Sequence, residues 1–187
     1  MSGKTRMAIF VHGGGWIQGS PDDMEPFAER FRAAGWRTRS LDYPLWPDAD
    51  VEAQSLYVRR RLRAIRVWNP ITTIVAIGGS AGGQMVLANT DHIDAAIGLN
   101  PALNTCSVGP PFQEAMNGKC EDQYPGPPRC PVLLIHGQDD DLVPIEFSRQ
   151  YNRQFAPVLL REREGVGHGW FNGVPDEISQ EMLSWLG

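Results

Sequence analysis

Apolar runs alternate with longer amphipathic stretches along the whole chain. Six short runs lie at residues 7–11, 38–41, 71–77, 95–99, 132–135 and 158–160, and several of them have little polar alternation. Strands covered by helices on both faces are apolar throughout, and strands separated by helices lie parallel in one sheet. The pattern therefore predicts an α/β fold with a mainly parallel sheet of about six strands and helices on both faces.

The stretches between these runs carry helix signals. Residues 21–35, PDDMEPFAERFRAAG, begin with acidic residues and stop at a glycine, which is typical of a capped helix. In residues 51–66, apolar or small side chains recur at helical spacing, at positions 51, 55, 58, 62 and 65. The arginines of this segment lie largely off that stripe: Arg59, Arg60, Arg61, Arg63 and Arg66. We interpret them as the solvated face of the helix, with an anion or RNA site as the alternative.

One long segment fits neither pattern. Residues 101–131 are irregular and hold prolines at positions 110, 111, 125, 127 and 128. A loop of this length inside a compact domain is usually functional or disordered. We expect one domain over residues 1–187, with residues 101–131 as a small lid or excursion loop.

Composition and charge narrow the classes of partner. The 187 residues are 42% hydrophobic and 21% charged, which suits a single globular domain. The net charge of −5 argues against a general nucleic-acid or anionic-membrane binder, because either would need a basic field. No apolar stretch reaches the roughly 18 residues of a membrane span, and the first residues do not resemble a secretory signal. We therefore expect a cytoplasmic protein with no nucleic-acid or membrane partner.

The cysteines give no clear metal or redox signal. Cys106, Cys120 and Cys130 lie within the irregular segment, and none belongs to a CxxC pair. An odd count favours structural thiols, while their clustering leaves a local disulfide open. No metal-ligand spacing appears elsewhere, so we expect neither a metal nor an organic cofactor.

The first candidate for chemistry is a serine in a glycine-rich turn. The stretch IVAIGGSAGGQMVLAN, residues 74–89, joins an apolar run to a helical one through G-x-S-x-G at residues 78–82. A nucleophile elbow requires this strand–turn–helix context. The turn holds its serine in a strained conformation, and the flanking glycines let strands and helix approach closely. We predict that Ser80 is a nucleophile.

A second glycine-rich stretch, VHGGGW at residues 11–16, follows the first apolar run. Acyl transfer builds negative charge on a carbonyl oxygen, and preorganised backbone N–H groups stabilise that charge. In esterases and lipases, an HGGG loop and the residue after the nucleophile supply these groups. Here they would come from Gly14, with Gly13 or Gly15, and from Ala81. The alternative is a flexible turn with no chemical role.

A serine nucleophile needs a base, and the base needs an acid that orients it. The run 132–135 leads to three adjacent aspartates at positions 139–141, and the run 158–160 is followed by His168 between glycines. Both places follow strands, where ligands bind in open α/β sheets. The chain order serine, aspartate, histidine is that of α/β hydrolases. Acids before a helix are often only caps, so the choice among Asp139, Asp140 and Asp141 stays open on this ground.

Together these motifs resemble the α/β-hydrolase superfamily, near the bacterial carboxylesterases, acetyl and feruloyl esterases and kynurenine formamidases that carry HGGxW and GxSAGG. The resemblance extends over nearly the whole chain. In such proteins the acid lies in an HGxxDxxVP segment, which matches positions 136, 137, 140, 143 and 144 and selects Asp140. Their GxGHGF-like histidine corresponds to His168. The resemblance gives His12 and His136 loop-shaping roles and places His92 on the surface.

The chain also departs from its larger relatives. Gly79 stands where the hormone-sensitive-lipase-like branch has the aspartate of GDSAGG. Larger members place further strands before the HGGG strand and often carry a helical cap. We therefore expect a minimal sheet, no large cap domain, an open site and an edge strand that could pair with a second copy.

The motifs and the resemblance imply a serine esterase that cleaves a small carboxylic ester through an acyl-enzyme intermediate. Trp16 and Trp170 adjoin the motifs and are candidate pocket residues, with core packing as the alternative for each. The same residues would serve an amidase, a formamidase, a thioesterase or an acyltransferase. A non-catalytic binding module is a further alternative.

Overall fold

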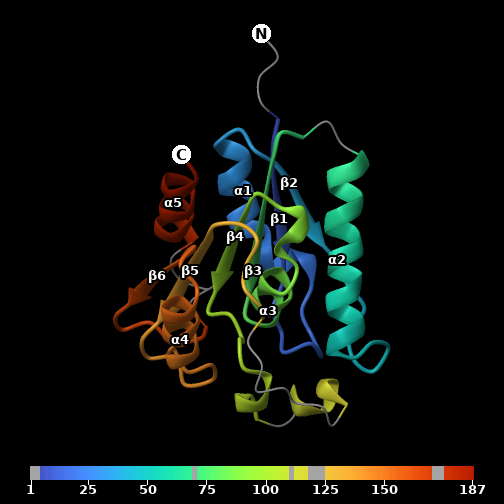
Figure 1. Ribbon diagram of the computed structural model, residues 1–187, viewed down its shortest axis with the longest axis vertical. Coiled ribbons are helices and arrows are strands. Elements are labelled where there is room, and N and C mark those ends of the chain that lie inside the picture. Colours follow the sequence, from blue (N-terminus) through green and yellow to red (C-terminus); the bar gives the residue numbers. More distant parts are fainter. Residues whose placement is uncertain (1–4, 69–70, 110–111, 118–124, 170–174) are drawn as a thin grey trace.

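The computed structural model describes residues 5–68, 71–109, 112–117, 125–169 and 175–187 (Figure 1). Within them six strands form one sheet in the order β2-β1-β3-β4-β5-β6, and all neighbouring strands are parallel. The strands are β1 (Arg6–Val11), β2 (Arg37–Leu41), β3 (Thr73–Gly79), β4 (Ala95–Leu99), β5 (Val132–Gly137) and β6 (Val158–Arg163). The prediction of an α/β fold with a parallel sheet of about six strands is therefore confirmed.

Helices cover both faces of this sheet. They are α1 (Glu25–Ala33), α2 (Val51–Trp68), α3 (Ala81–Leu87), α4 (Glu146–Gln154) and α5 (Pro175–Leu186), with 3₁₀ turns η1 (Pro21–Met24), η2 (Thr90–His92), η3 (Thr105–Ser107) and η4 (Phe112–Met116). Successive strand residues point to opposite faces, so Phe10 packs with α1 and α5 while its neighbour Ile9 packs with α2, α3 and α4. The core thus consists of two apolar layers, one on each side of the sheet.

Several elements differ in extent from the predicted ones: β3 lies two residues later than the run at 71–77, β5 extends two residues beyond residue 135, and two further cases are larger. The predicted helix at 21–35 is divided into η1 and α1, and the Ser20 backbone N–H donates to Asp23 Oδ2 at 2.8 Å at the start of η1. Strand β6 continues to Arg163, beyond the predicted end at residue 160. Strand β6 lies at the edge of the sheet and pairs with β5. This backbone pairing continues through Arg161 and Glu162, whose charged side chains are exposed, so the apolar pattern ends before the strand does.

Charged side chains mark both edges of the sheet. Arginines lie on β2 and β6, at positions 37, 39, 161 and 163. Charges on an edge strand oppose pairing with another chain. Association of two copies through an edge therefore stays a prediction, and this pattern does not favour it.

The arginines of α2 lie as predicted. Arg59, Arg60, Arg61 and Arg63 are exposed. Arg66 is half-buried and donates to Asp94 Oδ2 at 2.6 Å and to the carbonyl oxygen of His92 at 3.1 Å. The apolar stripe with Val58, Leu62 and Ile65 is buried against the sheet.

The cysteines divide into two kinds. Cys106 is disulfide-bonded, whereas Cys130 is a free buried thiol whose pKa is raised to about 12 by burial. Cys120 lies outside the described residues. Disulfides are rare in cytosolic proteins, so the cytoplasmic location stays a prediction. In the described parts of the chain, no helix has both the length and the apolar character needed to span a bilayer.

Strand β1 and helix α3 approach each other at backbone distance. A side-chain carbon on Gly82, at the start of α3, would lie 2.1 Å from the carbonyl oxygen of Val11 and 2.4 Å from that of His12. Both oxygens belong to backbone, which cannot move aside as a flexible side chain could. A residue without a Cβ atom is therefore required at position 82.

We predict that Gly82→Ala lowers the free energy of unfolding by about 1–3 kcal/mol or more, because the added carbon overpacks the contact between α3 and β1. Gly109→Ala is the matched control, since nothing lies within 4 Å of the added carbon. Urea denaturation of both variants checks this expectation. Equal midpoints for Gly82→Ala and the natural protein would contradict it.

Candidate active site

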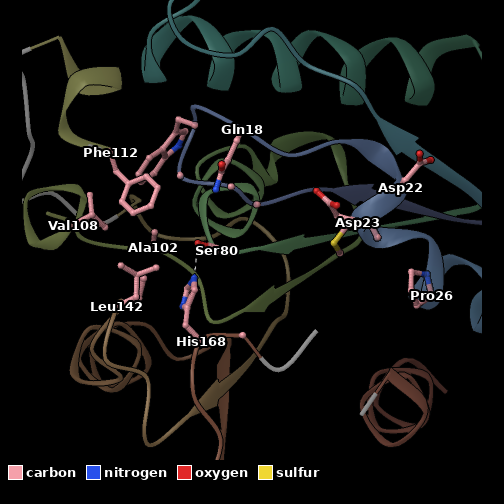
Figure 2. A pocket seen from close by; sticks show the side chains of 17 residues that line it. Gln18, Asp22, Asp23, Pro26, Ser80, Ala102, Val108, Phe112, Leu142 and His168 are labelled. Atoms are coloured by element: carbon pink, nitrogen blue, oxygen red, sulfur yellow. Dashed lines mark hydrogen bonds between the residues drawn. The ribbon is translucent and has the colours of Figure 1, made fainter. Parts of the chain in front are cut away.

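Three loops at the carboxyl edge of the sheet bring Ser80, Asp140 and His168 together. They follow β3, β5 and β6, so residues up to 88 positions apart meet at one place. Ser80 Oγ lies 3.0 Å from His168 Nε2, and His168 Nδ1 lies 2.7 Å from Asp140 Oδ2 (Figure 2 shows the first contact). A carboxylate only accepts, so Nδ1 donates to Asp140 and Nε2 is left to accept from the Ser80 hydroxyl. This line can move a proton away from the serine oxygen.

The turn that carries Ser80 is strained, as its glycine pattern predicts. Ser80 has a φ of +50°, a conformation that residues with a side chain rarely adopt. Its backbone N–H donates to the carbonyl oxygen of Leu99 at 2.8 Å, and its own carbonyl oxygen accepts from Ala102 at 3.1 Å. The end of β4 and the segment after it therefore hold the turn in place.

The carboxylate of Asp140 is buried but well supplied with donors. Its Oδ1 accepts from the backbone N–H groups of Val143 at 2.7 Å and Leu142 at 3.1 Å. Burial alone would raise the pKa of Asp140, but hydrogen bonds from His136, His168 and Val143 outweigh that effect and hold it well below its usual range. Asp140 is therefore a stable anion.

The neighbouring aspartates are different. Asp139 and Asp141 are exposed, whereas Asp140 is buried against His168. Of the three acids that the sequence leaves open, the structure brings only Asp140 to the serine and histidine.

His136 shapes the loop that carries Asp140. It is fully buried, and its Nε2 lies 2.9 Å from the carbonyl oxygen of Val143 and 3.3 Å from Asp140 Oδ2. Because both partners only accept, Nε2 carries the proton, and Nδ1 accepts from Ser148 Oγ at 2.7 Å. The loop is thereby fastened to α4.

The glycine loop after β1 lies beside the serine. A side-chain carbon on Gly13 would lie 3.1 Å from Ser80 Cβ, and Gly14 and Gly15 have φ angles of +98° and +61°. Within the described part of the chain, the backbone N–H groups of these glycines and of Ala81 donate no hydrogen bond to protein. Such free donors next to a serine oxygen are what a developing oxyanion requires.

Tyr43 supports this loop and was missed by the sequence analysis. Its hydroxyl donates to the carbonyl oxygens of His12 at 2.9 Å and Gly13 at 3.2 Å, and its ring stacks on His12 with centroids 4.1 Å apart. Burial lowers the pKa of His12, so this stacked ring favours its neutral form. The sequence offers only a weak signal for Tyr43, namely a tyrosine two residues after a strand, whose hydroxyl needs a partner once buried.

Asn100 was missed as well. It is fully buried directly after β4 and has a φ of +44°. Its Oδ1 accepts from the Gly137 backbone N–H at 3.0 Å, and its Nδ2 donates to the carbonyl oxygen of Gly167 at 3.2 Å. One amide thus joins the loop of Asp140 to the loop of His168. An asparagine that ends an apolar strand is the only signal in the sequence.

A cavity of about 470 Å³ lies in front of Ser80 and His168. Figure 2 shows apolar side chains at one end of it (Ala102, Val108, Phe112 and Leu142) and Asp22, Asp23 and Pro26 at the other, with Gln18, Ser80 and His168 between. Trp16 contributes to the lining although it is 1% exposed, so it serves both the wall and the core. Trp170 lies outside the described residues.

Comparisons with known proteins agree with the fold observed in the structure. Residues 8–125 match the family described as alpha/beta hydrolase fold. The chain is 22% identical to a solved structure of Thermogutta terrifontis esterase 2 phosphoramylated by tabun, with a TM-score of 0.82 over 98% of this chain and 82% of that one.

Curated relatives match over part of their length. One is the FAD-linked oxidoreductase pytB of Aspergillus terreus, 34% identical over 125 residues, which are 63% of this chain and 15% of that protein. Another is esterase LipC of Mycobacterium tuberculosis, 23% identical over 211 residues, with 87% of this chain and 52% of that protein covered. The chain therefore spans about half or less of these relatives.

The low pKa of Asp140 predicts a pH dependence of stability. A carboxyl whose pKa is depressed by folding stabilises the protein above its unfolded pKa of about 3.9, and this contribution fades as pH falls toward the folded value. We expect the difference in unfolding free energy between the natural protein and Asp140→Asn to shrink as the pH falls below about 4. Urea titrations from pH 3 to pH 7 measure it. A difference that stays constant down to pH 3 would contradict the expectation.

Proposed function

The chain belongs to the α/β-hydrolase fold family, and from this premise we propose that it is a serine hydrolase that cleaves a carboxylic ester of a small substrate through an acyl-enzyme intermediate. The observation that carries the proposal is the line from Ser80 through His168 to Asp140, with separations of 3.0 and 2.7 Å, at a cavity. The names of two similar proteins, esterase LipC and Thermogutta terrifontis esterase 2, support an ester as the bond.

In the first half of the reaction, His168 Nε2 accepts the proton of Ser80 while Oγ attacks the ester carbonyl carbon. The Asp140 carboxylate stabilises the imidazolium that forms. Backbone N–H groups of Gly14 and Ala81, with Gly13 or Gly15, donate to the oxyanion. The tetrahedral intermediate then collapses, the carbon–oxygen bond to the alcohol breaks, and His168 gives its proton to the departing alkoxide.

In the second half, water attacks the acyl-enzyme and gives up a proton to His168 Nε2. The second tetrahedral intermediate breaks its bond to Ser80 Oγ, which takes the proton back, and the carboxylic acid leaves. Every proton and bond is accounted for by the substrate, one water and the side chains of the chain. The reaction as proposed requires neither a metal nor an organic cofactor, nor a nucleic-acid or membrane partner.

Two alternative functions are considered: one keeps the serine chemistry, and the other has no catalytic activity. An amidase, formamidase, thioesterase or acyltransferase would use the same three side chains on a different bond or acceptor. A binding module would keep the cavity without turnover. The strained turn at Ser80 argues for catalysis, because strain of this kind persists where a site needs it.

We predict that a fluorophosphonate probe labels the natural protein and that Ser80→Ala abolishes the labelling, because only a serine activated by a base attacks such a probe rapidly. Ser179→Ala is the matched control, since this buried hydroxyl on α5 has no hydrogen-bond partner among the described residues. Intact-protein mass spectrometry counts the labels. An unlabelled natural protein with a cooperative unfolding transition would favour the binding module, and labelling retained in Ser80→Ala would exclude Ser80 as the nucleophile.

A matched substrate set identifies the bond. With one short acyl group on an aryl ester, a thioester and an anilide, we expect the largest kcat/KM for the ester and loss of turnover in Ser80→Ala. Spectrophotometric release of the leaving group measures all three. A larger kcat/KM for the anilide or the thioester would favour an amidase or a thioesterase.

A further inference from the structure

At the apolar end of the cavity, two segments that are distant in sequence are in direct contact. Gly15 has a φ of +61°, and a side-chain carbon built on it would lie 2.0 Å from Cδ1 and 2.3 Å from Cε1 of Phe112. The Phe112 ring therefore occupies the space that a side chain at position 15 would fill. The ring lies against the backbone of the glycine loop, two residues from Gly13, which adjoins Ser80.

The segment that carries Phe112 is anchored on both sides of it. Val108 and Met116 are 3% and 5% exposed, and both belong to the core cluster beneath α2 and α3. The Phe112 backbone N–H donates to the carbonyl oxygen of Gly109 at 3.1 Å, and the disulfide-bonded Cys106 lies earlier in the same segment. Phe112 is thus part of a packed wall, and displacing it would uncover core side chains.

The two ends of the cavity suit different halves of an ester. Asp22 and Asp23 at the polar end are exposed, so this end opens to solvent. The alcohol must leave and water must enter before the acyl group is released, which requires an open side next to His168. The acyl group stays covalently bound through that exchange, and the end walled by Val108 and Phe112 shields it from solvent.

We propose that Phe112 is the specificity-determining residue of the acyl site: its ring against Gly15 closes the apolar end and limits the acyl chain to a short one. This inference rests on the proposed function. It also gives the predicted lid at residues 101–131 a definite part, since a described stretch of that segment forms the end wall. The substrates are esters with a short apolar acyl group, and among the described residues that line the cavity the alcohol portion meets no comparable wall.

The test measures kcat/KM over two series of p-nitrophenyl and alkyl esters, without reductant so that the Cys106 disulfide is kept. One series lengthens the acyl chain from acetate to octanoate, and the other holds butyrate and lengthens the alcohol. For Phe112→Ala we expect the octanoate-to-butyrate ratio to rise at least about tenfold, as for a pocket enlarged by a few methylene groups. The alcohol series should keep its profile. Phe112→Leu fills more of the site and should give a smaller shift in the same direction.

Phe155→Ala is the matched control. Phe155 is also partly buried against the same core cluster, with its ring 4.8 Å from that of Tyr151, but it does not line the cavity. We expect Phe155→Ala to lower the free energy of unfolding without changing the kcat/KM profile of the acyl series or of the alcohol series. A change confined to the alcohol series would overturn the assignment of the apolar end, and unchanged profiles in both Phe112 variants would show that Phe112 is not the limiting wall. Turnover that still depends on Ser80 in those cases leaves the proposed function intact, whereas a natural protein that hydrolyses no ester overturns both.

Discussion

Where α3 begins, the backbone of Gly82 lies so close to the end of β1 that an added carbon would come within 2.1 Å of the Val11 carbonyl oxygen. This contact fixes the distance between the two glycine-rich stretches. Ser80 precedes Gly82 on the turn, and the loop of Gly13 to Gly15 continues from β1, so the approach of one backbone to the other sets the serine beside the free N–H groups. Larger residues at these glycine positions would push the loop after β1 away from the turn after β3. The glycines are thus required by packing before any chemistry is considered.

The second constraint on the structure is the buried charge of the Asp140 carboxylate. Removing the Asp140 carboxylate from water is unfavourable, and the structure offsets this with donors from His168, from the adjacent backbone and from His136. These donors lie on strand β5, on the loop after it and on the loop after β6, and these parts must keep their spacing for the anion to remain satisfied. The Asn100 side chain holds two of those loops together through Gly137 and Gly167. Charge satisfaction and loop geometry therefore depend on each other.

Local patterns predicted much of this arrangement. The apolar runs located all six strands, and the turn chemistry of the two glycine-rich stretches predicted the neighbourhood of Ser80 and Gly13. Spacing alone did not choose among the three aspartates; the resemblance did, and burial distinguishes Asp140 from its neighbours. Tyr43 and Asn100 had only weak signals, because each acts through contacts 30 or more residues away in sequence. A single sequence does not encode which distant backbone group a buried hydroxyl or amide will meet.

The reacting groups and the walls of the cavity also differ in how well local sequence patterns predict them. A serine on a strained turn needs particular residues at fixed local positions, so it leaves a motif in the sequence. A wall needs only apolar volume in the right place, which many side chains can supply from many segments. Phe112 belongs to an irregular stretch with no periodicity, yet its ring fits against Gly15 because that glycine leaves the room. The glycine motif therefore predicts that Gly15 leaves room for another group. That Phe112 fills this room is seen only in the folded chain.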